Sequence, residues 1–426
     1  MLSLERARRD NKREVFSMDV VYRCCCGIDV HKQMVVACVI KNGKRSLREF
    51  STHTAALREL CDWLLEVGCE QIAMESTGVY WKPLYNLFEM TDLSAIIVNA
   101  QHMKALPGRK TDVKDAEWIA DLLRHGLLKA SFVPSKEQRE TRDVVRYRKS
   151  LTEERARELN RFAKMLQGAN IKLDSVVSSL FGKSSQKLLQ LVLTGADINV
   201  KTVAPLVAKG MKADLETLVL ALDGIISPVL RMLLSSILDH IDDMSCRIEK
   251  LDAFVAEQMR EVSAAIDALC QIPGIGVTSA QIIVAEIGTD MSRFPSAAHL
   301  CSWAGVCPGN RESAGKRGSG KTNRGNKTLK STLANCSKSV SRTNTFFAAQ
   351  YHRISARRGK NRASVAVAHS MLIAIYHVLQ GADYHELGAD HYNRFNRERK
   401  INSHLRRLRE LGWTPDGSPM APGVAW

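Results

Sequence analysis

The sequence predicts an α/β domain followed by a mainly helical region, and three observations support this fold class. Residues 23–133 alternate between strand-like and helix-like hydrophobic patterns. Residues 137–166 and 230–262 are long, charged and apolar at helical spacing. Residues 263–380 contain further helical patterns around a loop rich in glycine and basic residues. At about 150 residues per domain, the 426 residues suggest two or three domains.

The first region begins with strand-like patterns and continues with alternating elements. A strand is predicted over 26–40, with a hairpin turn at Asn42-Gly43 and a second strand through Phe50. Further on, helices are predicted at 54–67, 79–90 and 112–123, and strands at 71–74 and 94–98. A hairpin followed by alternating helices and strands predicts a mixed sheet with helices on its faces.

The remaining chain is predicted to be helical. The two long charged patterns predict an antiparallel coiled-coil arm, a spacer or assembly element. A compact helical domain is expected next, with helices at 278–287, 327–341 and 363–380, and a basic helix at 393–411 follows it. We therefore expect an N-terminal extension (1–22), an α/β domain (23–133), a helical arm (134–262), a C-terminal domain (263–383) and a basic, polar tail (384–426).

The net charge of +16 points to a polyanionic partner, and most of it lies in one segment. Residues 301–362 hold fourteen lysine and arginine residues against one acid, Glu312. A membrane protein is not expected, because Asp223, Pro228 and Arg231 interrupt the most apolar long stretch and no secretory signal is present. The 11 cysteines form no C-x-x-C pair, which predicts reduced thiols in a cytoplasmic protein.

Four acids in the first region are candidate metal ligands. Asp29 and Glu75 follow apolar strand cores, and Asp112 and Asp115 are spaced to share one face of a helix. Such acids could hold two Mg²⁺ ions, the arrangement that serves phosphoryl transfer. Alternatively, Asp112 could cap a helix and Asp115 could lie in its first turn for structural reasons.

Two segments of the helical region could contact nucleic acid. The turn at Gly274 and Gly276 is similar to the hairpin of a helix-hairpin-helix, which offers backbone N–H groups to a phosphate, but it could equally be a plain turn. The loop 308–321 lacks the preceding strand of a Walker A loop. Its glycines permit a phosphate to approach the backbone closely. The basic side chains in and just after the loop could bind phosphates; they are Arg311, Lys316, Arg317, Lys321, Arg324 and Lys327.

Ser313 and Ser319 are the candidate nucleophiles of this loop. Taken alone, either hydroxyl is more often a phosphate contact or a solvated loop residue. Chemistry by itself does not choose between the two serines.

Several ordered motifs together resemble those of a known family. In the first half they are Gly27-Ile28-Asp29-Val30-His31-Lys32, Met74-Glu75-Ser76-Thr77-Gly78 and Lys110-Thr111-Asp112-Val113-Lys114-Asp115-Ala116. In the second half they are Ile272-Pro273-Gly274-Ile275-Gly276, Ala304-Gly305-Val306-Cys307-Pro308-Gly309 and Glu312-Ser313-Ala314-Gly315-Lys316. The chain resembles DEDD-type insertion-sequence transposases, the bridge-RNA-guided recombinases, which are related to pilin-gene DNA invertases.

The resemblance implies a RuvC-like, ribonuclease-H-type domain, a coiled-coil arm and a C-terminal transposase domain. It implies that the nucleophile is Ser313, which would form a phosphoserine link to DNA, and that the Mg²⁺ ligands are Asp29, Glu75, Asp112 and Asp115. It further implies a structured noncoding bridge RNA, donor and target DNA, and a tetramer, a dimer of dimers, with active sites shared between protomers.

Two other functions fit the same residues. A RuvC-like nuclease could use the acids with water as nucleophile to hydrolyse branched DNA, and it would not need Ser313. A non-catalytic nucleic-acid-binding protein would use the acids only structurally and the basic segment for binding.

Overall fold

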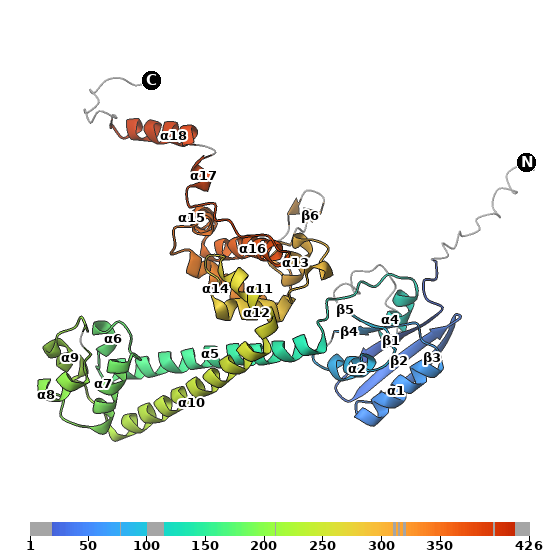
Figure 1. Cartoon of the computed structure of the whole chain (residues 1–426), viewed down its shortest axis with the longest axis horizontal. Helices are drawn as coiled ribbons and strands as arrows, with labels where there is room; N and C mark the ends of the chain where they lie inside the picture. Colours follow the sequence, from blue (N-terminus) through green and yellow to red (C-terminus); the bar gives the residue numbers. More distant parts are fainter. Residues whose placement is uncertain are drawn as a thin grey trace, which may run out of the picture. The chain divides into compact units, whose positions relative to one another are not determined.

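A computed structural model of the chain describes residues 19–76, 78–99, 115–208, 210–309, 312–313, 316–317, 321–394 and 397–413. The chain forms two compact units, Met1–Lys136 and Glu137–Trp426. The first unit contains the labelled strands β1 to β5, and the second contains the helices from α5 onward (Figure 1).

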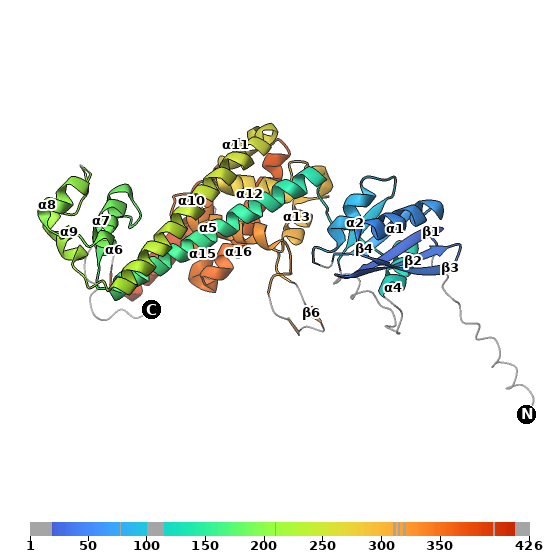
Figure 2. The same cartoon turned by 90° about the horizontal axis from the view of Figure 1, so that it is seen from below.

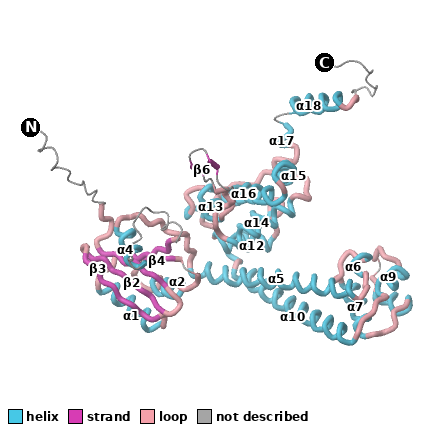
Figure 3. Tube along the Cα trace, turned by 180° about the vertical axis from the view of Figure 1, so that it is seen from behind, coloured by secondary structure: helices cyan, strands magenta, loops and turns pink. Residues whose placement is uncertain are grey.

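The first unit is built on a five-stranded mixed sheet, drawn in magenta in Figure 3, and its strand order is β3-β2-β1-β4-β5. Its strands are β1 (Cys24–Val30), β2 (Met34–Lys41), β3 (Lys44–Ser51), β4 (Gln71–Glu75) and β5 (Ala95–Val98). The first three strands are antiparallel, whereas β4 runs parallel to both β1 and β5. The predicted mixed sheet, followed by a mainly helical region, is therefore confirmed.

One predicted strand is wrong. The segment 26–40 contains two strands, β1 and β2, separated by a tight turn in which the amide of His31 donates to the carbonyl of Met34 at 2.9 Å. The polar run at 31–33 is the sequence signal for this turn. The second turn is as predicted, because Asn42 and Gly43 have φ values of 48° and 82°, which suit a two-residue hairpin loop.

Helices cover both faces of the sheet. Helices α1 (Thr54–Glu66) and α2 (Trp81–Phe88) lie on one face, and α4 (Asp115–Arg124) lies on the other (Figure 2). The three consecutive cysteines point alternately to these faces: Cys24 and Cys26 pack in the core under α1 and α2, and Cys25 packs under α4. Burial raises the pKa of the Cys25 thiol to about 12, so this thiol stays neutral and serves as a core residue.

The second unit begins with two long helices, α5 (Lys136–Gly168) and α10 (Pro228–Gln258). They run antiparallel, because Arg148 of α5 bonds Asp252 of α10 at 3.0 Å while Arg155 bonds Ser245 at 3.1 Å. A cluster of apolar residues packs the C-terminal end of α5 and the N-terminal end of α10 against four shorter helices. These are α6 (Leu173–Val176), α7 (Lys183–Thr194), α8 (Val200–Val203) and α9 (Leu215–Leu222).

The helices that follow pack around α16 (Lys360–Leu379). Among the described residues, α16 alone is long and apolar enough to cross a membrane, but half of that stretch is buried inside the protein. It therefore reads as a core helix. The others are α11 (Ser263–Cys270), α12 (Val277–Ile287), α13 (Ala297–Ala304), α14 (Lys327–Val340) and α15 (Phe346–Arg358). Short 3-10 turns lie at Ala204–Leu206, Arg260–Val262 and Met291–Arg293.

One helix of this region differs from expectation. Helix α15 was not predicted, because its aromatic start and basic end do not give a continuous apolar stripe. The expected tail also begins with ordered contacts: in α17 (His391–Arg394), the ring of Tyr392 stacks on Phe346 at 5.3 Å and lies under the guanidinium of Arg353 at 4.7 Å. Helix α18 (Arg397–Glu410) matches the predicted basic helix.

Gly27 should be irreplaceable, because it lets α4 lie directly on β1. A Cβ at this position would lie 2.2 Å from the amide nitrogen of Ala120 and 2.4 Å from the carbonyl oxygen of Ala116. We predict that Gly27→Ala lowers the free energy of unfolding by about 3 kcal/mol in urea denaturation. The control Gly168→Ala, at a position with open space, should change it by less than about 1 kcal/mol. Equal stability of the two variants would contradict this packing.

Candidate functional site

Two of the predicted acids end neighbouring strands of the sheet. Strands β1 and β4 are parallel, and Ile28 lies opposite Met74 in their register. The next residues are Asp29 and Glu75, so their backbones reach the same edge of the sheet side by side.

Both acids are on the face that α4 covers. Side chains alternate between the two faces of a strand. Cys25 and Ala73, which precede Asp29 and Glu75 by an even number of residues, pack in the core under α4. The two acids therefore share that face.

Helix α4 brings a third acid to this edge. Cys25, near the start of β1, donates its thiol to the carbonyl of Ala120 at 3.6 Å, and Gly27 further along the strand lies against Ala116. The helix thus runs antiparallel to β1, with its N-terminus toward the C-terminal end of the strand. Its first residue is the exposed Asp115.

The structure therefore brings Asp29, Glu75 and Asp115 toward one edge, while Asp112 lies outside the described residues. Among the residues that the structure describes, no three His, Cys, Asp or Glu side chains lie close enough together to hold a metal ion. Carboxylate oxygens are the protein ligands that Mg²⁺ prefers. The donor types fit this ion, but the described residues do not by themselves complete a site.

His31 is a residue of this edge that the sequence analysis did not single out. Its Nε2 lies 2.9 Å from Oδ2 of Asp29, whose side chain is only 15% exposed. One residue, Val30, separates them at the end of β1, and side chains two positions apart lie on one face of a strand. That spacing was the available signal, and it implies that the imidazole orients the carboxylate of Asp29.

The predicted nucleophile lies on a small β-ribbon of the second unit. Strands β6 (Glu312–Ser313) and β7 (Lys316–Arg317) pair antiparallel, with Ser313 opposite Lys316. The ribbon stands away from the surrounding helices in both Figure 1 and Figure 2. Ser319, the competing serine, and Arg311 lie outside the described residues. The backbone pairing thus puts Ser313 at the end of a strand, beside a basic residue.

The two ends of the loop that carries the ribbon are held together at its base. Pro308 and Thr322 form a backbone bridge, and the amide of Gly309 donates to the carbonyl of Lys321 at 3.1 Å. Below them a Cβ added to Gly325 would lie 2.4 Å from the nitrogen of Gly305, so the two chain segments touch. The glycines noted in the sequence thus have a packing role at this base.

The family comparisons cover both units. Residues 26–171 match the transposase model of the DEDD, IS110 type, and residues 266–352 match the model described as transposase IS116/IS110/IS902 family. The chain is an IS110-family DEDD transposase. It is a DNA transposase or recombinase. A comparison with curated proteins found no match.

A buried carboxylate anchors the serine loop of the transposase to its long helix α5. The side chain of Glu286 in α12 is fully buried, and its oxygens accept from Arg146 at 2.7 and 2.8 Å and from Asn326 Nδ2 at 2.6 Å. Arg142 lies 3.2 Å from it. Asn326 ends the loop and caps α14 by accepting from the amide of Leu329. One carboxylate therefore joins α5, α12 and the start of α14.

This network was missed in the sequence, although Glu286 is a lone acid in the apolar helix 277–287, which is a signal for a buried ion pair. Burial lowers the pKa of Arg142 to about 10, and Glu286 opposes this shift. The guanidinium therefore remains charged at neutral pH and balances the carboxylate.

The predicted basic contacts of the transposase gather around the loop. Lys321, Arg324 and Lys327 are exposed where the loop returns to α14, and Lys316 and Arg317 form β7. Residues 315–322 also spell G-K-R-G-S-G-K-T, the letter pattern of a phosphate-binding loop. Among the described residues, Lys316 and Arg317 form the strand β7 inside this pattern and α14 begins only at Lys327, which differs from the strand-loop-helix context of that motif.

The turn at 272–276 has a clear packing role. Gly274 has a φ of 88°, and a Cβ there would lie 2.9 Å from both the carbonyl oxygen of Cys336 and the Cβ of Val340 in α14. Gly276 precedes α12 and has open space around it. The requirement for Gly274 thus comes from α14, and a phosphate contact at Gly276 stays a prediction.

We predict that Glu286→Gln lowers the free energy of unfolding of the helical unit by about 3–5 kcal/mol, because it leaves Arg142 and Arg146 without a buried counter-charge. Urea denaturation of the full chain measures the effect. The matched control is Glu153→Gln, whose exposed side chain pairs with Lys149 and should contribute less than about 1 kcal/mol. A small effect at both positions would show that Glu286 does not hold the loop.

Proposed function

We propose that this transposase is an RNA-guided DNA recombinase of an insertion sequence that cuts and rejoins DNA through a phosphoserine at Ser313. The observation that carries the proposal is the presence, in one chain, of an acidic sheet edge and a serine on a basic, glycine-rich ribbon. The strand order β3-β2-β1-β4-β5, with acids at the end of β1 and β4, supports a RuvC-like, ribonuclease-H-type first domain.

In the proposed reaction, Oγ of Ser313 attacks the phosphorus of a DNA phosphodiester. A bond forms between Oγ and phosphorus, and the bond from phosphorus to the 3′ oxygen breaks. The hydroxyl proton of the serine is released, and the departing oxygen takes up a proton to give a free 3′-OH. The phosphoserine is still a diester, so a new 3′-OH can displace the serine by the reverse step and join strands without ATP.

The acids have a separate task in this scheme. Asp29, Glu75, Asp112 and Asp115 would hold two Mg²⁺ ions, which when bound neutralise phosphate charge and favour the alkoxide of an attacking hydroxyl. His31 orients Asp29 through its 2.9 Å contact. A serine hydroxyl is a poor nucleophile at neutral pH, which is why such a site needs activation.

The basic segment supports the proposed partners. Donor and target DNA and a structured noncoding bridge RNA would lie along residues 301–362, where the positive charge is concentrated. We further propose that the transposase acts in the cytoplasm as a tetramer, with the acids of one protomer serving the serine of another. The domain limits that go with this scheme are 23–133, 134–262 and 263–383.

The first test is a search for a covalent adduct. We predict that the transposase, incubated with its co-purified RNA, Mg²⁺ and nicked DNA, yields a protein–DNA adduct that survives denaturing electrophoresis. Ser313→Ala should remove the adduct, and the matched control Ser319→Ala should retain it. DNA cleavage by Ser313→Ala at the normal rate would favour a hydrolytic nuclease instead.

The second test separates catalysis from binding. Asp29→Asn and Asp115→Asn should reduce strand cleavage by at least about a hundredfold while DNA affinity is kept, because the acids hold the metal and not the DNA. The control is Asp121→Asn, at the other end of α4, where the carboxylate lies 3.7 Å from Arg45. Removal of Mg²⁺ with EDTA should mimic the first two variants. Normal cleavage by both Asp29→Asn and Asp115→Asn would show that these acids have only a structural role.

A further inference from the structure

The basic helix α18 has no part in the site described above. It lies beyond residues 266–352, the part of the second unit that matches a transposase family model. Of its 14 residues, six are lysine or arginine and two are acidic. A helix with this surplus of positive charge attracts a polyanion, and for a DNA transposase the first candidate is nucleic acid.

The C-terminal end of α18 is defined by its own sequence. Gly412 has a φ of 79°, and its amide donates to the carbonyl of Arg409 at 3.0 Å. The amide of Trp413 donates to the carbonyl of Leu408 at 2.9 Å. This pair of bonds is a Schellman motif, a helix end that uses a residue in the left-handed region, usually glycine. The helix therefore has a defined end that depends on no other segment.

Exposed polar residues line one face of α18. Asn402, Arg406 and Arg409 follow the i, i+4, i+7 spacing that aligns side chains along a helix, and all three are exposed. Leu405 and Leu408, each one position before an arginine of this face, belong to a separate apolar stripe and are half-buried. The polar face is therefore the one that α18 offers to a partner.

The residue types on this face are those that read DNA. Arginine donates two parallel hydrogen bonds to guanine or to a phosphate, and the amide of asparagine makes a similar pair of bonds with adenine. Arg406 pairs with Glu410 at 3.2 Å, but the two side chains are 84% and 61% exposed. Such an exposed pair contributes little stability, so Arg406 can exchange Glu410 for a base or a phosphate.

The dimensions of an α-helix favour duplex DNA over duplex RNA. With its side chains a helix is about 10–12 Å across, and the major groove of B-DNA is about 12 Å wide. The major groove of an RNA duplex is deep and narrow, and side chains do not read it. From Asn402 to Arg409 the helix rises about 10 Å, which is the height of about three base pairs.

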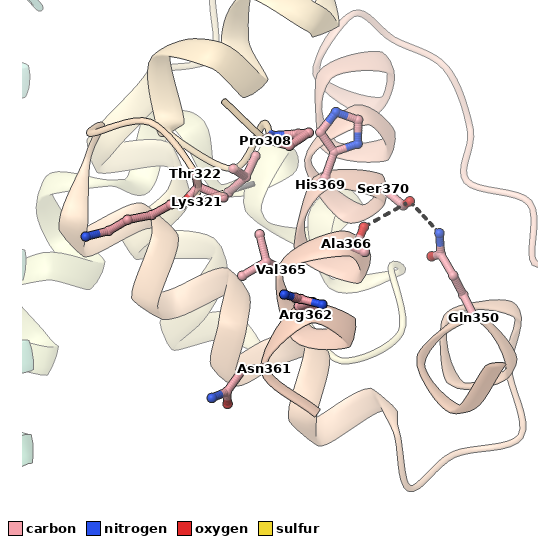
Figure 4. A pocket seen from close by; sticks show the side chains of 11 residues that line it. Pro308, Lys321, Thr322, Gln350, Asn361, Arg362, Val365, Ala366, His369 and Ser370 are labelled. Carbon is pink, nitrogen blue, oxygen red and sulfur yellow. Dashed lines mark hydrogen bonds between the residues drawn. The ribbon is translucent and has the colours of Figure 1, made fainter. Parts of the chain in front are cut away.

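The segment before α18 is fixed to the helices around α16. In α17, Tyr392 stacks on Phe346 and lies under the guanidinium of Arg353, and both of these partners belong to α15. Helix α15 is bonded in turn to α16, because Nε2 of Gln350 donates to Oγ of Ser370 at 2.9 Å (Figure 4). Two residues separate α17 from α18 along the chain. DNA bound by α18 would therefore be tied to the helices that support the serine loop.

We propose that α18 is a recognition helix that lies in the major groove of duplex DNA, with Asn402, Arg406 and Arg409 toward the base edges. It gives the transposase a DNA contact outside residues 301–362, with a sequence preference that needs no RNA. The inference rests on the DNA substrates of the family and not on the phosphoserine mechanism.

The test measures sequence preference and affinity in the absence of RNA. Full-length protein is treated with nuclease and repurified, then bound in EDTA to duplexes with a random-sequence core, and the bound DNA is sequenced. We expect the parent to enrich a motif of about three base pairs. Arg406→Gln/Arg409→Gln should lose this motif and should bind the enriched duplex roughly tenfold more weakly than the parent, as measured by fluorescence anisotropy.

Two controls separate the role of the helix from that of charge. Arg247→Gln/Arg260→Gln removes the same charge from exposed arginines that also pair with an acid three or four residues away, and it should bind like the parent. Ser403→Pro keeps every charge but breaks α18 near its middle, so it should lose the motif, whereas Ser403→Ala should keep it. Thermal unfolding should be unchanged in all of these variants, which shows that the rest of the chain is folded.

A modified duplex tests the groove. The enriched sequence is prepared with glucosylated 5-hydroxymethylcytosine, whose sugar fills the major groove and leaves the phosphates in place. We expect the parent to bind this duplex roughly tenfold more weakly than the unmodified one. Arg406→Gln/Arg409→Gln should bind the two duplexes equally, because it has already lost the groove contact.

Any one of four results would overturn the proposal. They are the absence of an enriched motif, an equal loss of affinity in Arg247→Gln/Arg260→Gln, equal binding of both duplexes by the parent, and a loss of affinity for a hairpin RNA with none for the duplex DNA. The last result would make α18 an RNA contact instead. Failure to find a serine adduct would remove the proposed mechanism but would leave these measurements unchanged, because no cleavage occurs in EDTA.

Discussion

The arrangement of the helical unit depends on one buried carboxylate. Glu286 accepts from Arg146 and Asn326 and lies within 3.2 Å of Arg142, so it joins the long helix α5 to the point where the serine loop ends. A buried charge is tolerated only with such partners, and the removal of any one leaves another unpaired. The loop therefore has a fixed base, while the ribbon with Ser313 extends beyond it.

In the first unit, close packing between a helix and a strand fixes the arrangement. Gly27 allows α4 to lie on β1, and this contact sets where the N-terminus of α4 falls relative to the strand ends. Because β1 and β4 are parallel neighbours, Asp29 and Glu75 reach the same edge. Acids that are far apart in the sequence thus come together for two reasons. Gly27 has no side chain to separate α4 from β1, and the register of β1 with β4 brings their ends to the same edge.

Much of this was predictable from the sequence, for physical reasons. The alternation around β4 and β5, the Asn42-Gly43 turn and the long charged helices are local patterns, and the structure contains all of them. The split of 26–40 into two strands was missed because apolar residues dominate both sides of a short polar turn. Helix α15, the pairing of His31 with Asp29 and the network of Glu286 depend on contacts between distant segments, which local patterns do not encode.

The central claim is that Ser313 becomes covalently attached to DNA. Mass spectrometry tests it most directly: the adduct is trapped with nicked DNA, digested with nuclease and protease, and the modified peptide is sequenced. The account predicts a nucleotide phosphate on Ser313. A modification on Ser319, or complete cleavage of the DNA with no modified serine, would contradict it.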